Sequence, residues 1–109
     1  MGEGRLSDAL ERIEAWYAAR LDGDWEHRYG LSVESCDNPG WWLRATLPDD
    51  AATRAAFAAL ETNAGRVPGL ETTLAEHPFG LTVGVFAPPG GLARALGVLA
   101  GALAPGDAA

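Results

Sequence analysis

The chain has 109 residues, of which 48% are hydrophobic and 21% charged, a composition typical of one folded domain spanning residues 1–109. This length excludes doubly wound two-domain enzymes and (β/α)8 barrels. The net charge of −7 argues against binding to nucleic acid, because a phosphate backbone requires a basic face.

Periodic apolar residues predict a first helix over residues 7–21. Leu10, Ile13, Trp16/Tyr17 and Leu21 recur at helical spacing and would form one apolar stripe. Ser7 is the expected N-cap, and Gly23 can take the left-handed conformation just past the helix end.

A β-hairpin is predicted next. Residues 28–34 alternate between apolar and polar types, and residues 41–47 supply the returning strand. The turn formers of residues 37–40 join the two strands. Because side chains alternate along a strand, Trp41 and Trp42 must face opposite sides of the sheet. Trp42 is then either an exposed interface anchor or covered by a helix on that second face.

The second half predicts a helix, two strands and a closing helix. Residues 49–63 are alanine-rich and favour a helix capped by Asp49 or Asp50, with Phe57 and Leu60 facing inward. A loop over residues 64–69 separates this helix from strands over residues 70–75 and 79–86. Leucines 92, 96, 99 and 103 mark the last helix, expected to end at Pro105-Gly106.

Two pairs of glycines suggest close approach between elements. Gly80 and Gly84 share one face of their predicted strand and leave room for a neighbour to pack closely. Gly97 and Gly101 are four residues apart and share a helix face that would allow close packing in the core. The element order predicts an α+β fold, in which a small, mostly antiparallel sheet packs against the N- and C-terminal helices.

The densest polar cluster is residues 22–27, which hold three carboxylates and an imidazole. One interpretation is a divalent-metal site, as in a small metal-dependent hydrolase, although the spacing matches no known metal loop. A second is acid–base catalysis by paired carboxylates, for which no nucleophile stands out. A third is structural: Asp22 and Asp24 cap backbone amides, Trp25 fills the core, and His27 binds a neighbouring carbonyl. We expect no enzyme, no metal and no cofactor.

The negative charge is concentrated in the first half of the chain. Residues 1–50 hold 11 acidic residues and 5 arginines, a net charge of −6, whereas the remaining residues carry −1. Such a one-sided field suits a basic protein partner, because it steers the encounter and fixes orientation. It equally serves solubility alone.

Three segments resemble the bacterial immunity protein 53 family. They are residues 15–17 (AWY), 22–30 (DGDWEHRYG) and 37–41 (DNPGW), which lie within a similarity over about residues 9–47. Gly90-Gly91-Leu92 and the leucine helix after it look like the family's closing helix, while alanine-rich residues 50–63 depart from the more strand-like, aromatic middle of the family.

The resemblance implies a small antitoxin, encoded beside a polymorphic toxin, that binds and neutralises one cognate toxin protein without catalysis. Many such toxins are basic nucleases, which an acidic inhibitor could cover by mimicking phosphate charge. The charge asymmetry and paired tryptophans lead us to expect a contact surface formed by Asp22, Asp24, Glu26, Glu34 and Trp42. A homo-oligomeric interaction module remains the alternative, and the sequence does not specify the oligomeric state.

The cellular compartment of the protein is predicted from its cysteine content and from the hydropathy of its segments. Cys36 is the one cysteine, so no intrachain disulfide forms and a reducing compartment is the simpler interpretation. Residues 1–7 lack the apolar core of a signal peptide, and the longest apolar run, residues 95–104, is shorter than the roughly 20 residues that span a bilayer. We expect a cytoplasmic protein that does not enter a membrane.

Overall fold

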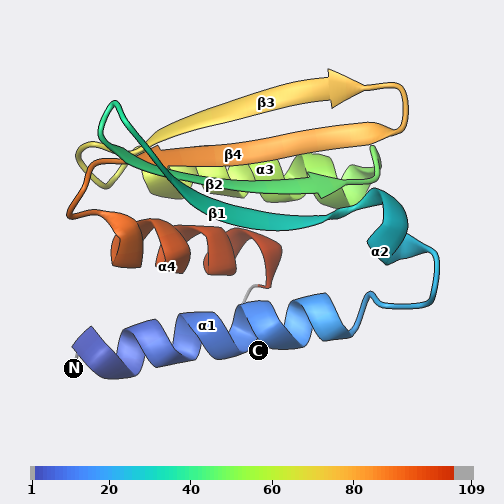
Figure 1. Cartoon of the computed structure of the whole chain (residues 1–109), viewed down its shortest axis with the longest axis horizontal. Helices are drawn as coiled ribbons and strands as arrows, with labels where there is room; N and C mark the ends of the chain where they lie inside the picture. Colours follow the sequence, from blue (N-terminus) through green and yellow to red (C-terminus); the bar gives the residue numbers. More distant parts are fainter. Residues whose placement is uncertain (1, 105–109) are drawn as a thin grey trace.

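The computed structural model describes residues 2–104, with side chains from Ser7 onward, and has the predicted α+β architecture (Figure 1). The elements in chain order are α1 (Gly2–Ala18), α2 (Trp25–Arg28), β1 (Gly30–Cys36), β2 (Gly40–Leu47), α3 (Ala51–Ala64), β3 (Glu71–His77), β4 (Gly80–Ala87) and α4 (Leu92–Leu103). The expected end of the last helix, Pro105-Gly106, lies outside the described residues.

The four strands form one antiparallel sheet in the order β1-β2-β4-β3. Each half of the chain contributes one hairpin, and the two hairpins join where β2 pairs with β4. In this register Trp42 is paired with Phe86, and Leu43 with Val85. Residues distant in sequence therefore become neighbours at the centre of the sheet.

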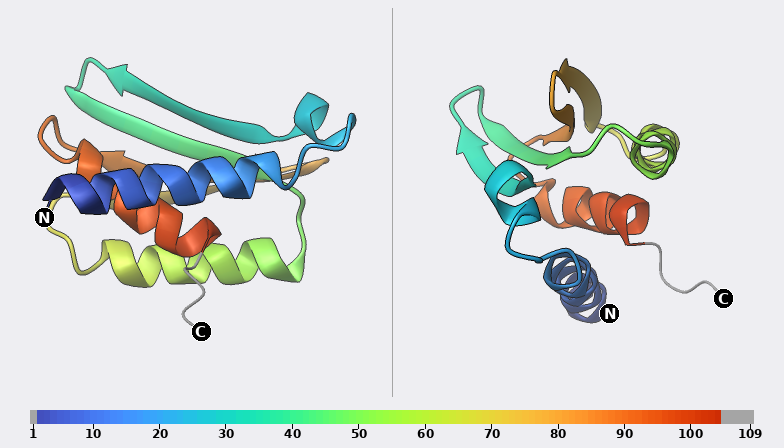
Figure 2. Two further views of the ribbon diagram at one scale, coloured as in Figure 1. Left: turned by 90° about the horizontal axis from the view of Figure 1, so that it is seen from below. Right: turned by 90° about the vertical axis from the view of Figure 1, so that its right-hand side faces the viewer.

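The helices α1, α3 and α4 lie on one side of the sheet, as Figure 2 shows. α3 and α4 contact the sheet directly, while α1 packs on α4. Alternate residues of β2 and β4, including Leu43, Ala45, Val83 and Val85, are at most 1% exposed because they face this helical layer. Leu99 of α4 is completely buried among them, so the hydrophobic core lies between the sheet and the helices.

The first helix differs from its prediction at both ends. It already includes Gly2, so Ser7 lies within the helix and is not its N-cap, and it ends at Ala18 rather than at residue 21. Gly23 has a φ of +90°, but it lies in the following loop, several residues beyond the helix end.

The apolar stripe of α1 is also narrower than predicted. Ile13 and Trp16 are buried, whereas Leu10, Tyr17 and Leu21 are 44, 40 and 44% exposed. The physical reason is that α1 packs mainly on α4, so only a narrow strip of its surface is covered. The Arg12 side chain stabilises the contact between α1 and the end of α4 by donating a hydrogen bond from Nε to the Ala104 carbonyl at 3.0 Å.

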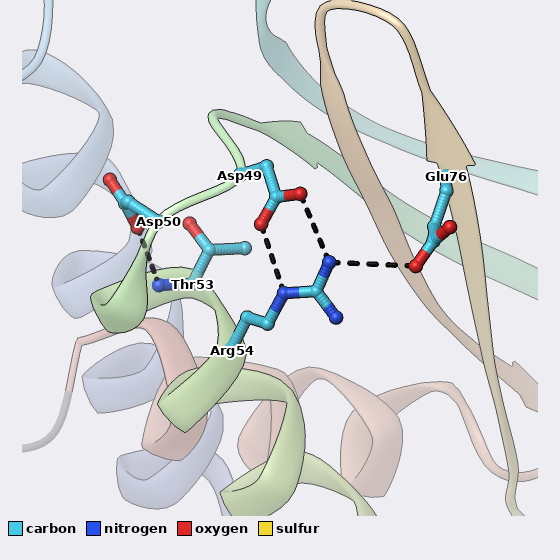
Figure 3. A network of polar contacts seen from close by, with 5 residues as sticks. All are labelled: Asp49, Asp50, Thr53, Arg54 and Glu76. Carbon is cyan, nitrogen blue, oxygen red and sulfur yellow. Dashed lines mark hydrogen bonds and ion pairs between the residues drawn. The ribbon is translucent and has the colours of Figure 1, made fainter.

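The alanine-rich segment forms α3 as predicted. The Asp50 carboxylate caps the helix by accepting a hydrogen bond from the Thr53 amide at 2.8 Å, and Leu60 is fully buried. Arg54 donates to both oxygens of Asp49 at 2.9 and 3.0 Å and reaches Glu76 at 3.5 Å (Figure 3). This network connects the start of α3 to strand β3.

The two glycine pairs behave differently. A Cβ on Gly80 would collide with the Leu47 carbonyl oxygen, and one on Gly84 would lie 2.8 Å from Thr73 Oγ1, so the close approach predicted in this strand is confirmed. The close packing expected at Gly97 and Gly101 is wrong, because a Cβ there would meet nothing within 4 Å. Gly97 is exposed, and Gly101 lines an open hollow between α1, α3 and α4.

Candidate functional site

In the described part of the chain no helix covers the outer face of the sheet (Figure 2). Every second strand residue points away from the helices, and these residues form cross-strand rows. The alternative in which a second helix covers Trp42 is therefore wrong: Trp42 lies on this outer face, partly exposed, while Trp41 lies on the helical side.

One of these rows combines aromatic and acidic side chains, and we call it the aromatic row. The strand register places its members side by side across the sheet, in the order Glu34, Trp42, Phe86, Glu71. The rings of Trp42 and Phe86 meet edge to face with centroids 5.3 Å apart. Carboxylates on the two edge strands flank this aromatic pair, which would suit an apolar anchor contact surrounded by basic groups of a partner.

Arg44 stabilises the aromatic row from the adjoining row. Its guanidinium lies over the Trp42 ring, 4.9 Å from the centroid, and Nη1 is 4.0 Å from Oε1 of Glu34. Both side chains are about half exposed, so the ion pair contributes little to stability. The contact with the Trp42 ring therefore connects the two rows more closely than the contact with Glu34 does.

A polar and aromatic group occupies the other end of the outer face. The hydroxyls of Thr46 and Thr82 are 2.9 Å apart, and Thr82 Oγ1 is 2.8 Å from Nε2 of His77. The His77 ring stacks on Phe79, which is 51% exposed. The Tyr29 hydroxyl donates to the Phe79 carbonyl at 2.9 Å and closes this end of the sheet.

The predicted polar cluster, residues 22–27, forms a compact loop that leads into the helical turn α2. Asp22 Oδ1 accepts hydrogen bonds from the amides of Asp24 and Trp25, each at 2.8 Å. The Glu26 carboxylate accepts from the amides of Asp22 at 3.1 Å and Gly23 at 2.8 Å. The hydrogen bonds from Trp25 and Asp24 lower the pKa of Asp22 below its ordinary value.

This geometry agrees with the structural interpretation of the cluster for Asp22 but not for Asp24. Asp24 occupies the N-cap position of α2, yet its side chain makes no capping hydrogen bond. Trp25 packs against the core and contacts the rings of Trp16 and Tyr29, each with centroids 5.9 Å apart. His27 is exposed. Within residues 2–104, three or more side chains of the His, Cys, Asp or Glu type nowhere gather to hold a metal ion.

The five predicted contact residues fall into two separate groups. Glu34 and Trp42 are cross-strand partners in the aromatic row. Asp22 and Asp24 lie in the loop before α2 and Glu26 lies in α2, so all three are beyond the opposite end of β1. Sequence reasoning missed Phe86, Glu71 and Arg44 as members of the surface, because only the register of β2, β4 and β3 brings them beside Trp42.

Comparison with known proteins gives one match. A sequence profile described as Immunity protein 53 matches residues 10–83, which is more than half of the chain. The match includes the alanine-rich helix α3, where we had noted a departure, and it stops before α4. No curated protein and no solved structure matches the chain. Separately, none of the helices in the described residues is long and apolar enough to cross a membrane.

Proposed function

Because the chain belongs to the immunity protein 53 family, we propose that it is an antitoxin that binds one cognate toxin protein and neutralises it without catalysis. The family match is the observation that carries this proposal, and it supports an immunity role in general. The identity of the toxin is part of the proposal: we expect a basic enzyme, with a nuclease as the first class to test.

In this proposal the toxin docks on the outer face of the sheet. Trp42 and Phe86 supply the apolar anchor, since tryptophan is enriched among residues that dominate binding energy. Glu34 and Glu71 flank the anchor and can pair with basic side chains around the active site of the toxin. Inhibition then results from occlusion of the site.

Asp22, Asp24 and Glu26 act differently in this proposal. The Asp22 and Glu26 carboxylates already accept hydrogen bonds from the backbone of their own loop, but they are charged and Asp22 and Asp24 are exposed. They contribute to the negative field that attracts a basic partner and form the acidic rim of the contact. Rapid association is an advantage for an antidote, which must act before the toxin does.

The test is neutralisation of the toxin encoded beside this chain. Co-expression of the wild-type chain should restore growth, and the purified proteins should form a one-to-one complex. Trp42→Ala should weaken the complex by about 2 kcal/mol, or about 30-fold in Kd, because it removes the central anchor. Glu34→Ala should have a smaller effect in the same direction. Titration calorimetry measures both.

Matched controls lie on the helical side of the molecule. Leu10→Ala truncates an apolar side chain that is 44% exposed on α1, and Glu61→Ala removes one exposed carboxylate from α3. Both should bind the toxin as the wild type does. If the wild-type chain neither binds nor protects, the antitoxin function is wrong; if only the controls lose affinity, the toxin docks on the helices instead.

A further inference from the structure

A hollow of about 430 Å³ lies on the outer face of the sheet, beside the aromatic row. Its floor is formed by β1, β2 and β4, and its end by α2 and the turn between β3 and β4. Besides Gly30 and Leu31, the hollow is lined by two arginines, three hydroxyl residues and two aromatic residues, namely Arg28, Arg44, Ser32, Thr46, Thr82, Tyr29 and Phe79. None of the lining residues carries a negative charge.

The hollow is a basic spot on a strongly acidic protein. The chain has a net charge of −7, and of its eight arginines two line this one hollow. Arg28 is exposed and forms no ion pair with any of the residues that the structure describes. Arg44 is 44% exposed and is held only loosely by Glu34, at 4.0 Å.

These groups match the chemistry of a carboxylate. A guanidinium donates two parallel hydrogen bonds to a carboxylate, and hydroxyls supply further donors. The residues Tyr29 and Phe79 also line the hollow, and their rings offer apolar contact to the methylene groups of an acidic side chain. An arginine, a lysine or a nucleic-acid base would leave the two guanidiniums without an anionic partner.

We propose that this hollow accepts an aspartate or glutamate side chain of the cognate toxin and thereby determines which toxin the chain recognises. The proposal rests on the proposed antitoxin function and assigns the site to the toxin interface, because Arg44 borders both the hollow and the Trp42 ring. The acidic field attracts any basic protein, but only a toxin with a carboxylate at the right position satisfies Arg28 and Arg44. Specificity arises because a toxin without that carboxylate leaves these charges unpaired on binding.

Removal of either arginine separates this proposal from simple charge attraction. Arg28→Ala and Arg44→Ala each make the chain more acidic, so attraction to a basic toxin alone would leave binding equal or tighter. If a toxin carboxylate occupies the hollow, each substitution should instead lower the affinity for the toxin encoded beside the chain by about tenfold or more. Arg94→Ala, which removes an exposed arginine of α4, is the matched control for charge and should not weaken binding.

Three further measurements test the folding of the variants, the role of the guanidinium and the identity of its partner. Circular dichroism should show that the variants keep the fold, and Arg44→Lys, which retains the charge but not the planar fork, should lose less affinity than Arg44→Ala. In double-mutant cycles between Arg28→Ala and alanine variants of each acidic toxin residue, one toxin residue should show a coupled loss rather than an additive one.

The outcomes distinguish failure of the carboxylate site from failure of the antitoxin function. Suppose that the wild-type chain binds the toxin, but that Arg28→Ala and Arg44→Ala bind it as well as Arg94→Ala does. The hollow is then not a carboxylate site, although the antitoxin function stands. The same conclusion follows if no toxin carboxylate couples to Arg28. If the wild-type chain fails to bind the toxin at all, the antitoxin function itself fails. Selective, coupled loss at Arg28 and Arg44 supports both.

Discussion

At the scale of single residues, the acidic side chains in the first half of the chain have different structural roles. Asp22 and Glu26 accept backbone hydrogen bonds and shape the segment before β1, whereas Glu34 lies on the outer face of the sheet beside Trp42. Asp49 is held by Arg54, whose hydrogen bonds and positive charge lower the pKa of that carboxyl. In the composition, each of these side chains counts as one negative charge, and their different contacts cannot be distinguished.

The lowered pKa of Asp22 predicts a pH dependence of stability. Its folded pKa is below its ordinary value of 3.8, so the folded state binds fewer protons than the unfolded state near that pH. The stabilising effect is fully present above pH 3.8 and is lost as the pH falls through the folded pKa. Asp22→Asn should therefore lower the denaturant midpoint at neutral pH, and the difference from wild type should shrink below the ordinary pKa.

Asp24→Asn is the control for this measurement, since it removes a carboxylate of the same loop that caps no amide of α2. Urea unfolding followed by tryptophan fluorescence is suitable, because the Trp25 amide donates a hydrogen bond to Asp22 and the Trp25 ring contacts Trp16. If Asp22→Asn lowers the denaturant midpoint by the same amount at every pH, the effect does not come from the lowered pKa of Asp22.

At the scale of elements, α4 shows that a strongly apolar helix is not uniformly packed. Ala95, Leu99 and Ala100 are completely buried, yet Gly97 is exposed with open space around it. Gly80 in β4 has the opposite environment, because the Leu47 carbonyl oxygen occupies the space of a Cβ. The structure therefore requires glycine at position 80 but not at position 97.

This contrast predicts opposite effects of the same substitution. Gly97→Ala should raise the free energy of unfolding by about 0.5–1 kcal/mol, because alanine favours the helix and meets no clash. Gly80→Ala should lower it, because strand β4 must move away from β2. Thermal unfolding should show a higher Tm for the first variant and a lower Tm for the second. A Tm decrease for Gly97→Ala would show that the surroundings of Gly97 are tighter than described.

At the scale of the whole molecule, the helical layer and the outer face of the sheet form two different sides of the surface. The helical layer closes the core, and the outer sheet face carries the aromatic row and the hollow. The acidic loop of residues 22–26 adjoins the start of β1 and places negative charge at the border between these two sides. A basic partner would be attracted broadly and then oriented by the sheet face.

This arrangement predicts how charge affects binding kinetics. Association with a basic toxin should slow as ionic strength rises, because salt screens the field. The triple variant Asp22→Asn/Asp24→Asn/Glu26→Gln should lower the association rate several-fold and change the dissociation rate much less, whereas Trp42→Ala should mainly raise the dissociation rate. Stopped-flow fluorescence at several salt concentrations measures both. An association rate insensitive to salt would exclude steering by this field.

The sequence by itself determined the local structure of this protein. Strand alternation in residues 41–47, the turn formers of residues 37–40 and the Asp50 cap of α3 are short-range features, so the elements they predict were confirmed. The opposite orientations of Trp41 and Trp42 also follow from one strand alone. In α1 the predicted bounds were wrong, and the buried face is narrower than predicted: Ile13 and Trp16 are buried, but Leu10 and Tyr17 stay exposed because α1 packs mainly on α4.

Only the tertiary structure decided what lies on the outer face. The pairing of β2 with β4 places Phe86 beside Trp42, and that of β4 with β3 completes the row with Glu71. The hollow requires residues of α2, three strands and a turn to meet, some of them about 50 positions apart in the chain. Such surfaces depend on strand register and on which face the helices cover, and both are set by long-range packing that no short stretch of sequence encodes.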